Sequence, residues 1–456
     1  MHREGADGPV VASTAGNAER AKGSDGRASD PRQPTGEERG ANAKAFDIPK
    51  QLVVEAYRRV KANRGAAGVD GESLRQFEAD RKNQLYKIWN RLSSGSYFPP
   101  AVRRVEIEKA GGGTRPLGIP TVADRIAQAV VKQVLEPHVD LQFHVDSYAY
   151  RPGKSAHQAV AQARQRCWTY DWVIDLDIKG FFDNLPHEYV ERAVARHTTL
   201  PWVKLYVARW LRAPVQHPDG RQEVRDKGTP QGGVISPLLA NLFLHYALDR
   251  WLQRHYPIVP FERYADDMIV HCRSEQEAQR VLAAIRERLA ACGLELHPTK
   301  TRIVYCKDGR RRRSYEHVSF DFLGYTFRAR PARNRQGRVH LGFLPAISAK
   351  AAQAIRQRIA KWRLLSRISQ SLTDLATLTN ATVLGWLNYY GRFYRSACQQ
   401  VLQSLNHALS RWAFRKLKIY RRRSRRAAME WLRRVALRDP SVLALWQHGV
   451  IPYARP

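Results

Sequence analysis

Two short carboxylate-rich stretches restrict the fold of this chain more than any other feature. Residues 261–270 form two strand-like runs that meet at Tyr264-Ala-Asp-Asp267, a pattern that predicts a tight hairpin with both acids at its tip. Upstream, an apolar run ends at Asp177 and is followed by a turn that contains glycine. An isolated Asp-Asp pair is more often a solvated turn, so the prediction depends on the flanking apolar runs and on Asp177.

The carboxylates of Asp177, Asp266 and Asp267 together predict a two-metal site. Adjacent like charges are costly unless a cation lies between them. We therefore expect the three side chains to hold two Mg²⁺ ions roughly 3.5–4 Å apart, with Mn²⁺ as an alternative that suits the same ligands. One ion would activate a 3′-hydroxyl, and the other would stabilise a leaving pyrophosphate.

Hydrophobic periodicity predicts an α+β core followed by helices. Strand-like stretches at 102–107, 172–176 and 267–271 alternate with helix-like stretches at 121–136, 237–253 and 275–291. Beyond residue 345 the strand signals disappear, and apolar residues from Ile355 to Ile368 mark one helix face. The first 45 residues contain no aromatic residue, which predicts a disordered tail.

The charge of the chain points to nucleic acid as its partner. There are 76 Lys and Arg residues against 42 Asp and Glu, a formal net charge of +34. Such an excess repels itself in a compact protein unless a polyanion neutralises it. Residues 301–456 contain 32 of the basic residues and only 6 of the acidic ones, so the last third should carry the main polyanion-binding surface.

The sequence contains neither a membrane span nor a disulfide framework. No apolar run approaches the roughly 18 to 20 residues of a spanning helix, and the N-terminus has no signal-peptide pattern. We therefore expect a soluble, cytoplasmic protein without a membrane partner, and association with a prokaryotic nucleoid is compatible with its charge. Five cysteines without C-x-x-C spacing predict reduced core thiols.

Several further motifs occur in a fixed order around the acids. They are 65–71, 109–120, 147–157, 228–237, 293–301, 320–325 and 384–395. With Asp177 and residues 264–267, they make the chain resemble the reverse transcriptase/maturase proteins encoded by mobile group II introns. The resemblance covers about residues 46–450.

This resemblance implies a fold and a set of domains. It implies an α+β right-hand polymerase with fingers and palm at 46–340, followed by an all-α thumb and maturase region, also called domain X, at 341–410. A basic, helical DNA-binding region would follow at 411–456, and residues 1–45 would be the tail. The implied reaction is RNA-directed extension of a DNA primer or target with dNTPs. The implied second role is to bind the intron RNA, assist its splicing and support intron mobility; the sequence identifies no protein partner.

The resemblance also assigns roles to residues that contact the nucleotide. Lys109 and Arg115 would bind the triphosphate from a loop at the tip of the fingers. The structural alternative is that the segment between them is an exposed hairpin turn. Phe182 would be a steric gate that excludes the 2′-hydroxyl of a ribonucleotide, although such a phenylalanine is more often simply core. Gln231 would contact the nucleotide. Lys300 would be the general acid for pyrophosphate, although a surface lysine is equally compatible with the sequence.

The remaining assignments concern the nucleic acids. Phe322, Leu323 and Gly324 match a primer grip that presses the primer 3′ end toward the metals. In the maturase-like segment 384–395, the aromatic residues are expected to pack a core rather than stack on bases, so its arginines would contact RNA. The arginines proposed to bind RNA or DNA are Arg392, Arg395, Arg421, Arg422, Arg423, Arg425 and Arg426.

The sequence leaves alternatives to this function open. One is a retron, diversity-generating or defence reverse transcriptase, against which the maturase-like segment argues. Another is a splicing or RNA-binding factor with a vestigial polymerase fold, and an RNA-dependent RNA polymerase is disfavoured by Phe182. Many relatives carry a C-terminal His-Asn-His nuclease with paired C-x-x-C motifs, which this sequence lacks. We therefore expect priming from an existing 3′ end, such as a nascent strand at a replication fork.

Overall fold

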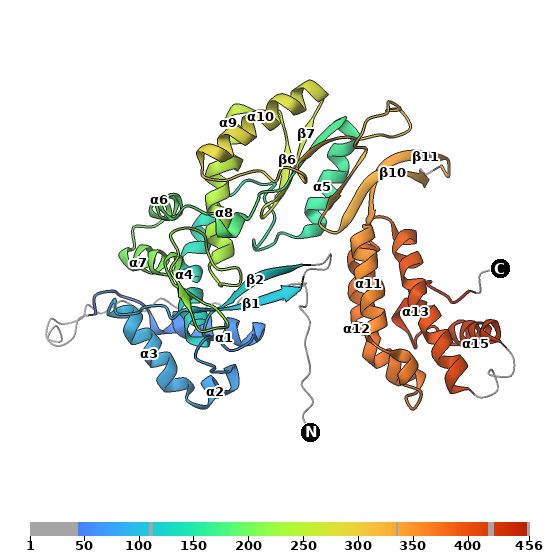
Figure 1. Cartoon of the computed structure of the whole chain (residues 1–456), viewed down its shortest axis with the longest axis horizontal. Coiled ribbons are helices and arrows are strands. Elements are labelled where there is room, and N and C mark those ends of the chain that lie inside the picture. The colour runs from blue at the N-terminus through green and yellow to red at the C-terminus, as the bar shows by residue number, and fades with distance from the viewer. Residues whose placement is uncertain (1–43, 109–112, 334–335, 418–423, 454–456) are drawn as a thin grey trace, which may run out of the picture. The chain divides into compact units, whose positions relative to one another are not determined.

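The computed structural model describes residues 44–108, 113–333, 336–417 and 424–453 (Figure 1). The predicted tail lies outside these residues except for its last two positions. Lys109 and the predicted DNA-binding residues Arg421, Arg422 and Arg423 also lie outside them.

A four-stranded antiparallel sheet carries the predicted acids, with the strand order β6-β7-β3-β8. The strands are β3 (Trp172–Leu176), β6 (Phe261–Tyr264), β7 (Asp267–Cys272) and β8 (Arg302–Tyr305). Their content of β-branched and aromatic residues favours extended backbone. Side chains alternate between the faces of a strand. In β3, Trp172, Ile174 and Leu176 contribute to one apolar cluster, whereas Val173 contributes to another.

Helices cover both faces of this sheet. Helix α10 (Glu275–Ala291) packs against β3, β7 and β8, and helix α5 (Ala156–Thr169) packs against β6 and β7 (Figure 1). In α10, the buried residues Val281, Ile285 and Leu289 recur every four residues, which is the spacing of one helix face. Ser155 and Gln158 form a capping box that begins α5. Helices therefore bury both faces of the sheet, so polar side chains are accommodated at the ends of its strands.

The segments around this core are helical, with one mixed sheet. The helices are α1 (Lys50–Asn63), α2 (Leu74–Ala79), α3 (Arg81–Ser93), α4 (Val122–Asp140), α6 (His187–His197), α7 (Pro201–Leu211), α8 (Ser236–Leu244) and α9 (Arg250–His255). A π-helix, η2 (His245–Asp249), joins α8 to α9, and a short 3-10 turn, η1 (Phe181–Asp183), follows β3. The mixed sheet has the order β2-β1-β4-β5. Its strands are β1 (Val102–Glu108), β2 (Thr114–Ile119), β4 (Val215–Gln216) and β5 (Gln222–Glu223).

A three-stranded sheet leads into the C-terminal helices. The strands are β9 (Ser319–Phe322), β10 (Tyr325–Arg333) and β11 (Val339–Ile347), with β10 in the middle. The helical elements are α11 (Ala349–Lys361), η3 (Leu364–Ser366), α12 (Leu372–Tyr390), α13 (Arg395–Lys416), α15 (Arg425–Arg438) and α16 (Ala444–Gln447). Helix α13 packs against α11, α12 and α15, which run beside it in Figure 1. These helices share a separate apolar core that includes Trp362, Leu405 and Trp412.

The structure confirms the coarse fold expected from the sequence, an α/β region followed by helices. One detail was wrong: α11 ends at Lys361, and Arg363 adopts a left-handed backbone with φ of 49°. Ile368, which we expected on that helix face, is therefore exposed. All five cysteines are buried and unpaired, as expected. Among the described residues, no helix is long and apolar enough to cross a membrane.

Candidate active site

The three predicted acids meet at one end of the central sheet. Asp177 directly follows β3, whereas Asp266 and Asp267 lie where β6 turns into β7. Leu176 of β3 pairs with Met268 of β7, so Asp177 and Asp267 occupy neighbouring positions at the ends of adjacent strands. The spacing along the sequence could not show this adjacency, because it depends on which strands pair.

The hairpin that carries two of the acids is as tight as the sequence predicts. Tyr264 pairs with Asp267, which leaves Ala265 and Asp266 as a two-residue loop. Ala265 has a φ of 60°, a left-handed conformation that costs a non-glycine residue about 1 kcal/mol or more. Surrounding contacts must therefore hold the loop in place.

A buried ion pair provides those contacts. Arg263 donates to the Asp249 carboxylate through Nε at 2.7 Å and through Nη2 at 2.6 Å, and both side chains are almost completely buried. Its Nη1 donates to the carbonyl of Ala265 at 3.1 Å and to Asn241 Oδ1 at 2.9 Å. Asn241 in turn donates to the carbonyl of Ala149 at 2.7 Å. One guanidinium thus connects the catalytic hairpin, the π-helix that supplies Asp249, helix α8 and the segment before Tyr150.

The acids form a cluster in which burial and the neighbouring charges disfavour the ionised carboxylates. Burial raises the pKa of Asp267 well above its usual range, and the carboxylates of Asp175 and Asp266 raise it further. Burial also raises the pKa of Asp266, with an additional contribution from Asp177. Protons or cations are therefore needed to neutralise this end of the sheet.

Asp175 is a member of the cluster that our sequence reasoning missed. It lies two residues before Asp177, hence on the same face of β3. Burial raises its pKa to about 6, although Arg302 opposes the shift through a hydrogen bond of 3.2 Å from its Nε. The Asp-Leu-Asp spacing was the available signal, because period two places both acids on one side of a strand.

Lys300 contacts Asp177, the first of the predicted catalytic acids, directly. Its Nζ lies 2.8 Å from Oδ2 of Asp177, and its side chain is largely exposed. The backbone N–H of His297 donates to the Asp177 carbonyl at 2.7 Å, which fixes the loop that carries Lys300. The structure therefore places Lys300 in the site. Its ammonium group contacts the carboxylate of Asp177, which is also a predicted metal ligand.

The donor set fits Mg²⁺, which prefers carboxylate oxygens as protein ligands. Burial and neighbouring carboxylates raise the pKa values of Asp266 and Asp267, and a bound cation would favour their ionised forms. Within the described parts of the chain, no three acidic, histidine or cysteine side chains are already arranged to hold a metal ion. Asp177 is turned toward Lys300 instead, so metal binding would require its carboxylate to exchange that partner.

Two of the predicted nucleotide contacts flank the acids. Phe182 lies in the turn after Asp177 and is half-buried against the main apolar core, whereas its neighbour Phe181 is fully buried within that core. The carbonyl of Phe182 accepts a bond of 2.7 Å from the N–H of Thr229, which begins the loop that carries Gln231. The structure thus joins the Phe182 turn to the Gln231 loop.

Strand β2 approaches the same loop. The N–H of Gly118 donates to the carbonyl of Gln231 at 2.7 Å. Gly232 has a φ of 118°, and a Cβ there would lie 2.4 Å from the carbonyl oxygen of Gly118. Arg115 is exposed on this strand. Lys109, its predicted partner, lies outside the described residues.

Tyr150 is a second residue that our sequence reasoning did not single out. It has a φ of 56°, which is unusual for an aromatic residue. Desolvation of its hydroxyl and the Asp266 carboxylate raise its pKa, while Arg115 lowers it. These influences place Tyr150 within electrostatic reach of both the acids and the β2 strand.

The predicted primer grip is a tight turn between β9 and β10. Phe322 pairs with Tyr325, and the two residues between them, Leu323 and Gly324, have φ values of 52° and 79°. Two successive left-handed residues are typical of a two-residue hairpin loop. A hydrogen bond from the Leu323 backbone lowers the pKa of Asp267, against the larger effect of burial.

Four of the predicted nucleic-acid-binding arginines lie among the described residues, in the turn after α12 and at the starts of α13 and α15. Arg392 and Arg395 are exposed, and Arg395 donates to the carbonyl of His448 at 2.9 Å. Arg425 and Arg426 are exposed in the first turn of α15, which contains no acidic residue. Cations at a helix N-terminus oppose the helix dipole, so helix stability does not explain their presence there.

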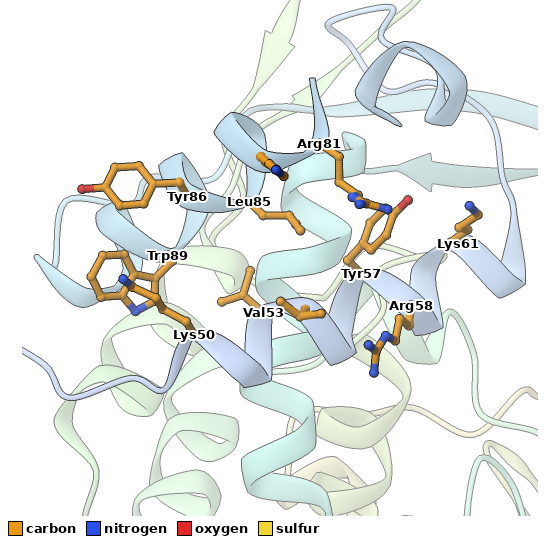
Figure 2. Close-up of a pocket in the computed structure, with 11 residues that line it drawn as sticks. Lys50, Val53, Tyr57, Arg58, Lys61, Arg81, Leu85, Tyr86 and Trp89 are labelled. Carbon is orange, nitrogen blue, oxygen red and sulfur yellow. The ribbon is translucent and has the colours of Figure 1, made fainter. Parts of the chain in front are cut away.

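A cavity of about 520 Å³ lies between α1 and α3, on different residues from the predicted site. Figure 2 shows Val53, Tyr57 and Leu85 along it, with Lys50 beside Trp89. It contains none of the predicted catalytic or substrate-binding residues. Its size therefore does not identify the active site, which is defined by the converging acids.

Comparison with known proteins agrees with this geometry. Residues 107–327 match the family described as reverse transcriptase (RNA-dependent DNA polymerase), and residues 352–431 match the group II intron, maturase-specific domain.

Individual relatives match different lengths of the chain. The chain is 30% identical over 333 residues to Protein YkfC of Escherichia coli, which covers 63% of this chain and 83% of that protein. It is 32% identical over 200 residues to the group II intron-encoded protein LtrA of Lactococcus lactis, covering 43% of this chain and 33% of that protein. The nuclear intron maturase 2 of Arabidopsis thaliana is 25% identical over 218 residues, covering 39% of this chain and 29% of that protein. The chain therefore belongs to the family of group II intron-encoded reverse transcriptases and maturases, with an RNA-directed DNA polymerase domain and a maturase-specific domain in one polypeptide.

Proposed function

We propose that this chain extends a DNA 3′-hydroxyl on an RNA template, using Asp177, Asp266 and Asp267 to hold two Mg²⁺ ions. The observation that carries the proposal is the convergence of these acids from β3 and the β6–β7 hairpin at one end of the sheet, where burial raises the pKa values of Asp266 and Asp267. Bound Mg²⁺ would activate the primer hydroxyl and stabilise the leaving pyrophosphate.

The residues around the acids would select and orient the nucleotide. Arg115, together with Lys109, would hold the triphosphate by charge-assisted hydrogen bonds. Gln231 would contact the nucleotide from the loop that β2 supports, and the Phe182 ring would occupy the space of a ribose 2′-hydroxyl. Lys300, whose ammonium already contacts Asp177, would donate a proton to the leaving pyrophosphate.

The larger arrangement follows from the same family membership. Residues 46–340 would form the fingers and palm of a right hand, 341–410 the thumb and maturase region, and 411–456 a DNA-binding region. The Phe322–Gly324 turn would press the primer 3′ end toward the metals. The basic surface of residues 301–456 would bind the intron RNA and stabilise its folded, splicing-competent form by mass action, in the cytoplasm, where intron RNA and target DNA are both present.

Primer extension on an RNA template tests this function. Wild-type protein should incorporate dNTPs, and Asp266→Ala/Asp267→Ala should lose incorporation because its metal ligands are gone. Binding of the RNA that copurifies with the wild type should change by less than about threefold, since remote cations hold that RNA. Asp219→Ala, which removes an exposed turn carboxylate, is the matched control.

Two outcomes would contradict the proposal. Incorporation by the double variant would show that the acids are not the metal ligands. A wild type that binds RNA but never extends a primer would favour the alternative of an RNA-binding factor with a vestigial polymerase fold.

A further inference from the structure

Tyr389, one residue before the end of α12, joins the maturase helix to the primer-grip turn. Its hydroxyl donates to the carbonyl of Leu323 at 2.9 Å. Its own carbonyl accepts hydrogen bonds from the Tyr325 hydroxyl and, at 3.0 Å, from Nε2 of His157. A carbonyl in the last turn of a helix has no partner within that helix, so β10 and α5 supply the missing donors.

Aromatic packing makes this junction rigid. The Tyr389 ring lies 5.5 Å from the ring of Tyr325 and 4.9 Å from that of His157, measured between centroids. Tyr390 packs against the other side of the turn, where a Cβ on Gly324 would lie 3.3 Å from its hydroxyl oxygen. As the sequence led us to expect, these aromatic residues pack in the protein interior, here where the palm-side cluster meets α12.

The turn lies beside the strand that begins at Asp267. Strand β9, which enters the turn, packs against β7, and the Leu323 carbonyl accepts the hydrogen bond from the Tyr389 hydroxyl. Leu323 is held at a φ of 52°, which a leucine adopts only when neighbouring contacts fix it. The Tyr389 hydroxyl supplies such a contact.

We propose that Tyr389 is a positioning residue of the polymerase reaction, whose hydroxyl fixes the primer-grip turn against Asp267. This inference rests on the proposed function, because it requires the turn to hold a primer end. It gives the maturase helix a role in the chemistry, because α12 holds the turn beside the acids through the hydrogen bond from Tyr389.

Tyr389→Phe is the decisive variant because it removes one hydroxyl and keeps the ring. Tyr394→Phe is the matched control, since the Tyr394 hydroxyl donates at 3.0 Å to the carbonyl of Pro331, farther along β10 and away from the turn. Both variants lose one tyrosine-to-carbonyl bond. The measurement is single-turnover incorporation of one dNTP by the full chain on a preformed complex with a DNA primer and an RNA template.

Tyr389→Phe should lower the maximal incorporation rate by about threefold to tenfold, which corresponds to the loss of one hydrogen bond in the transition state. The dNTP concentration at half-maximal rate should change by less than about twofold, because the nucleotide contacts lie elsewhere. Tyr394→Phe should leave both quantities unchanged, and the two variants should melt within a few degrees of each other.

Equal incorporation rates in the two variants would overturn the inference. So would a rate loss in Tyr389→Phe that disappears when only molecules competent to bind the primer–template are counted, since that would indicate a structural defect alone. An inactive wild type would instead overturn the proposed function, so the two failures are distinguishable.

Discussion

At the scale of single residues, the structure shows different environments for Phe181 and Phe182. The sequence alone does not distinguish these two neighbouring phenylalanines. Phe181 is fully buried and packs its ring 5.3 Å from that of Phe182, which is only half-buried. Phe182 follows Asp177 by five positions, and its carbonyl is bonded to the loop that precedes Gln231. Both rings contact the main core, but only Phe182 keeps an exposed part that a nucleotide could contact.

Replacing Phe182 with Ala should open the space in which a ribose 2′-hydroxyl would lie. We expect ribonucleotide use to rise relative to deoxynucleotide use by about tenfold in kcat/KM, equivalent to about 1.4 kcal/mol. The ratio of the two efficiencies on one primer and template is the quantity to measure. Phe181→Ala is the contrast: it should lower the free energy of unfolding by about 3–5 kcal/mol and leave the ratio unchanged. An unchanged ratio in Phe182→Ala would disprove the gate.

At the scale of elements, the backbone of β2 closely approaches the loop that carries Gln231. This approach sets the distance between Arg115 on β2 and Gln231, which are both predicted nucleotide contacts. The bond from Gly118 to Gln231 requires that position 232 carry no side chain. The sequence shows a pair of adjacent glycines here, but only the packing reveals that one of them faces a carbonyl oxygen.

Gly232→Ala should therefore push β2, with Arg115, away from the Gln231 loop. Gly220→Ala is the matched control, because Gly220 also has a positive φ, 87°, but a Cβ there meets nothing within 4 Å. We expect the control to lower the free energy of unfolding by about 1 kcal/mol through backbone strain, and Gly232→Ala to lower it by about 2–4 kcal/mol. Chemical denaturation measures both values. The KM for dNTP should rise only in Gly232→Ala, and an equal effect of the two substitutions would contradict the packing argument.

At the scale of the whole molecule, charge and chemistry occupy different parts of the chain. The carboxylates cluster on the central sheet, whereas the helical region after β11 carries most of the excess positive charge. Polymerisation depends on a few carboxylates held in position, and nucleic-acid binding depends on many cations, so substitutions should affect the two functions separately.

Neutralising Arg421, Arg422, Arg423, Arg425 and Arg426 with Gln should weaken DNA binding and flatten its salt dependence. Each lost phosphate contact should reduce the slope of log K against log salt by nearly one unit. Fluorescence anisotropy with a DNA duplex from 50 to 200 mM salt, roughly the range in which such contacts are resolved, measures the slope. Incorporation on a homopolymer template should fall less than DNA binding does. If the slope stays the same, these arginines do not contact DNA.

The sequence by itself was enough to predict the carboxylate cluster, because a metal site needs acids at the ends of apolar strands and those patterns are local. Period-two and period-3.6 spacing located the acid-bearing strands β3 and β7 and the helices α4, α8 to α9 and α10 within a few residues. The sequence could not show that Asp175 lies near Asp267, that Arg263 and Asp249 hold the hairpin, or that Tyr389 reaches Leu323. Those contacts join residues that are distant in the chain, and only the packing of the sheet, the π-helix and α12 brings them within the few ångströms over which hydrogen bonds and buried charges act.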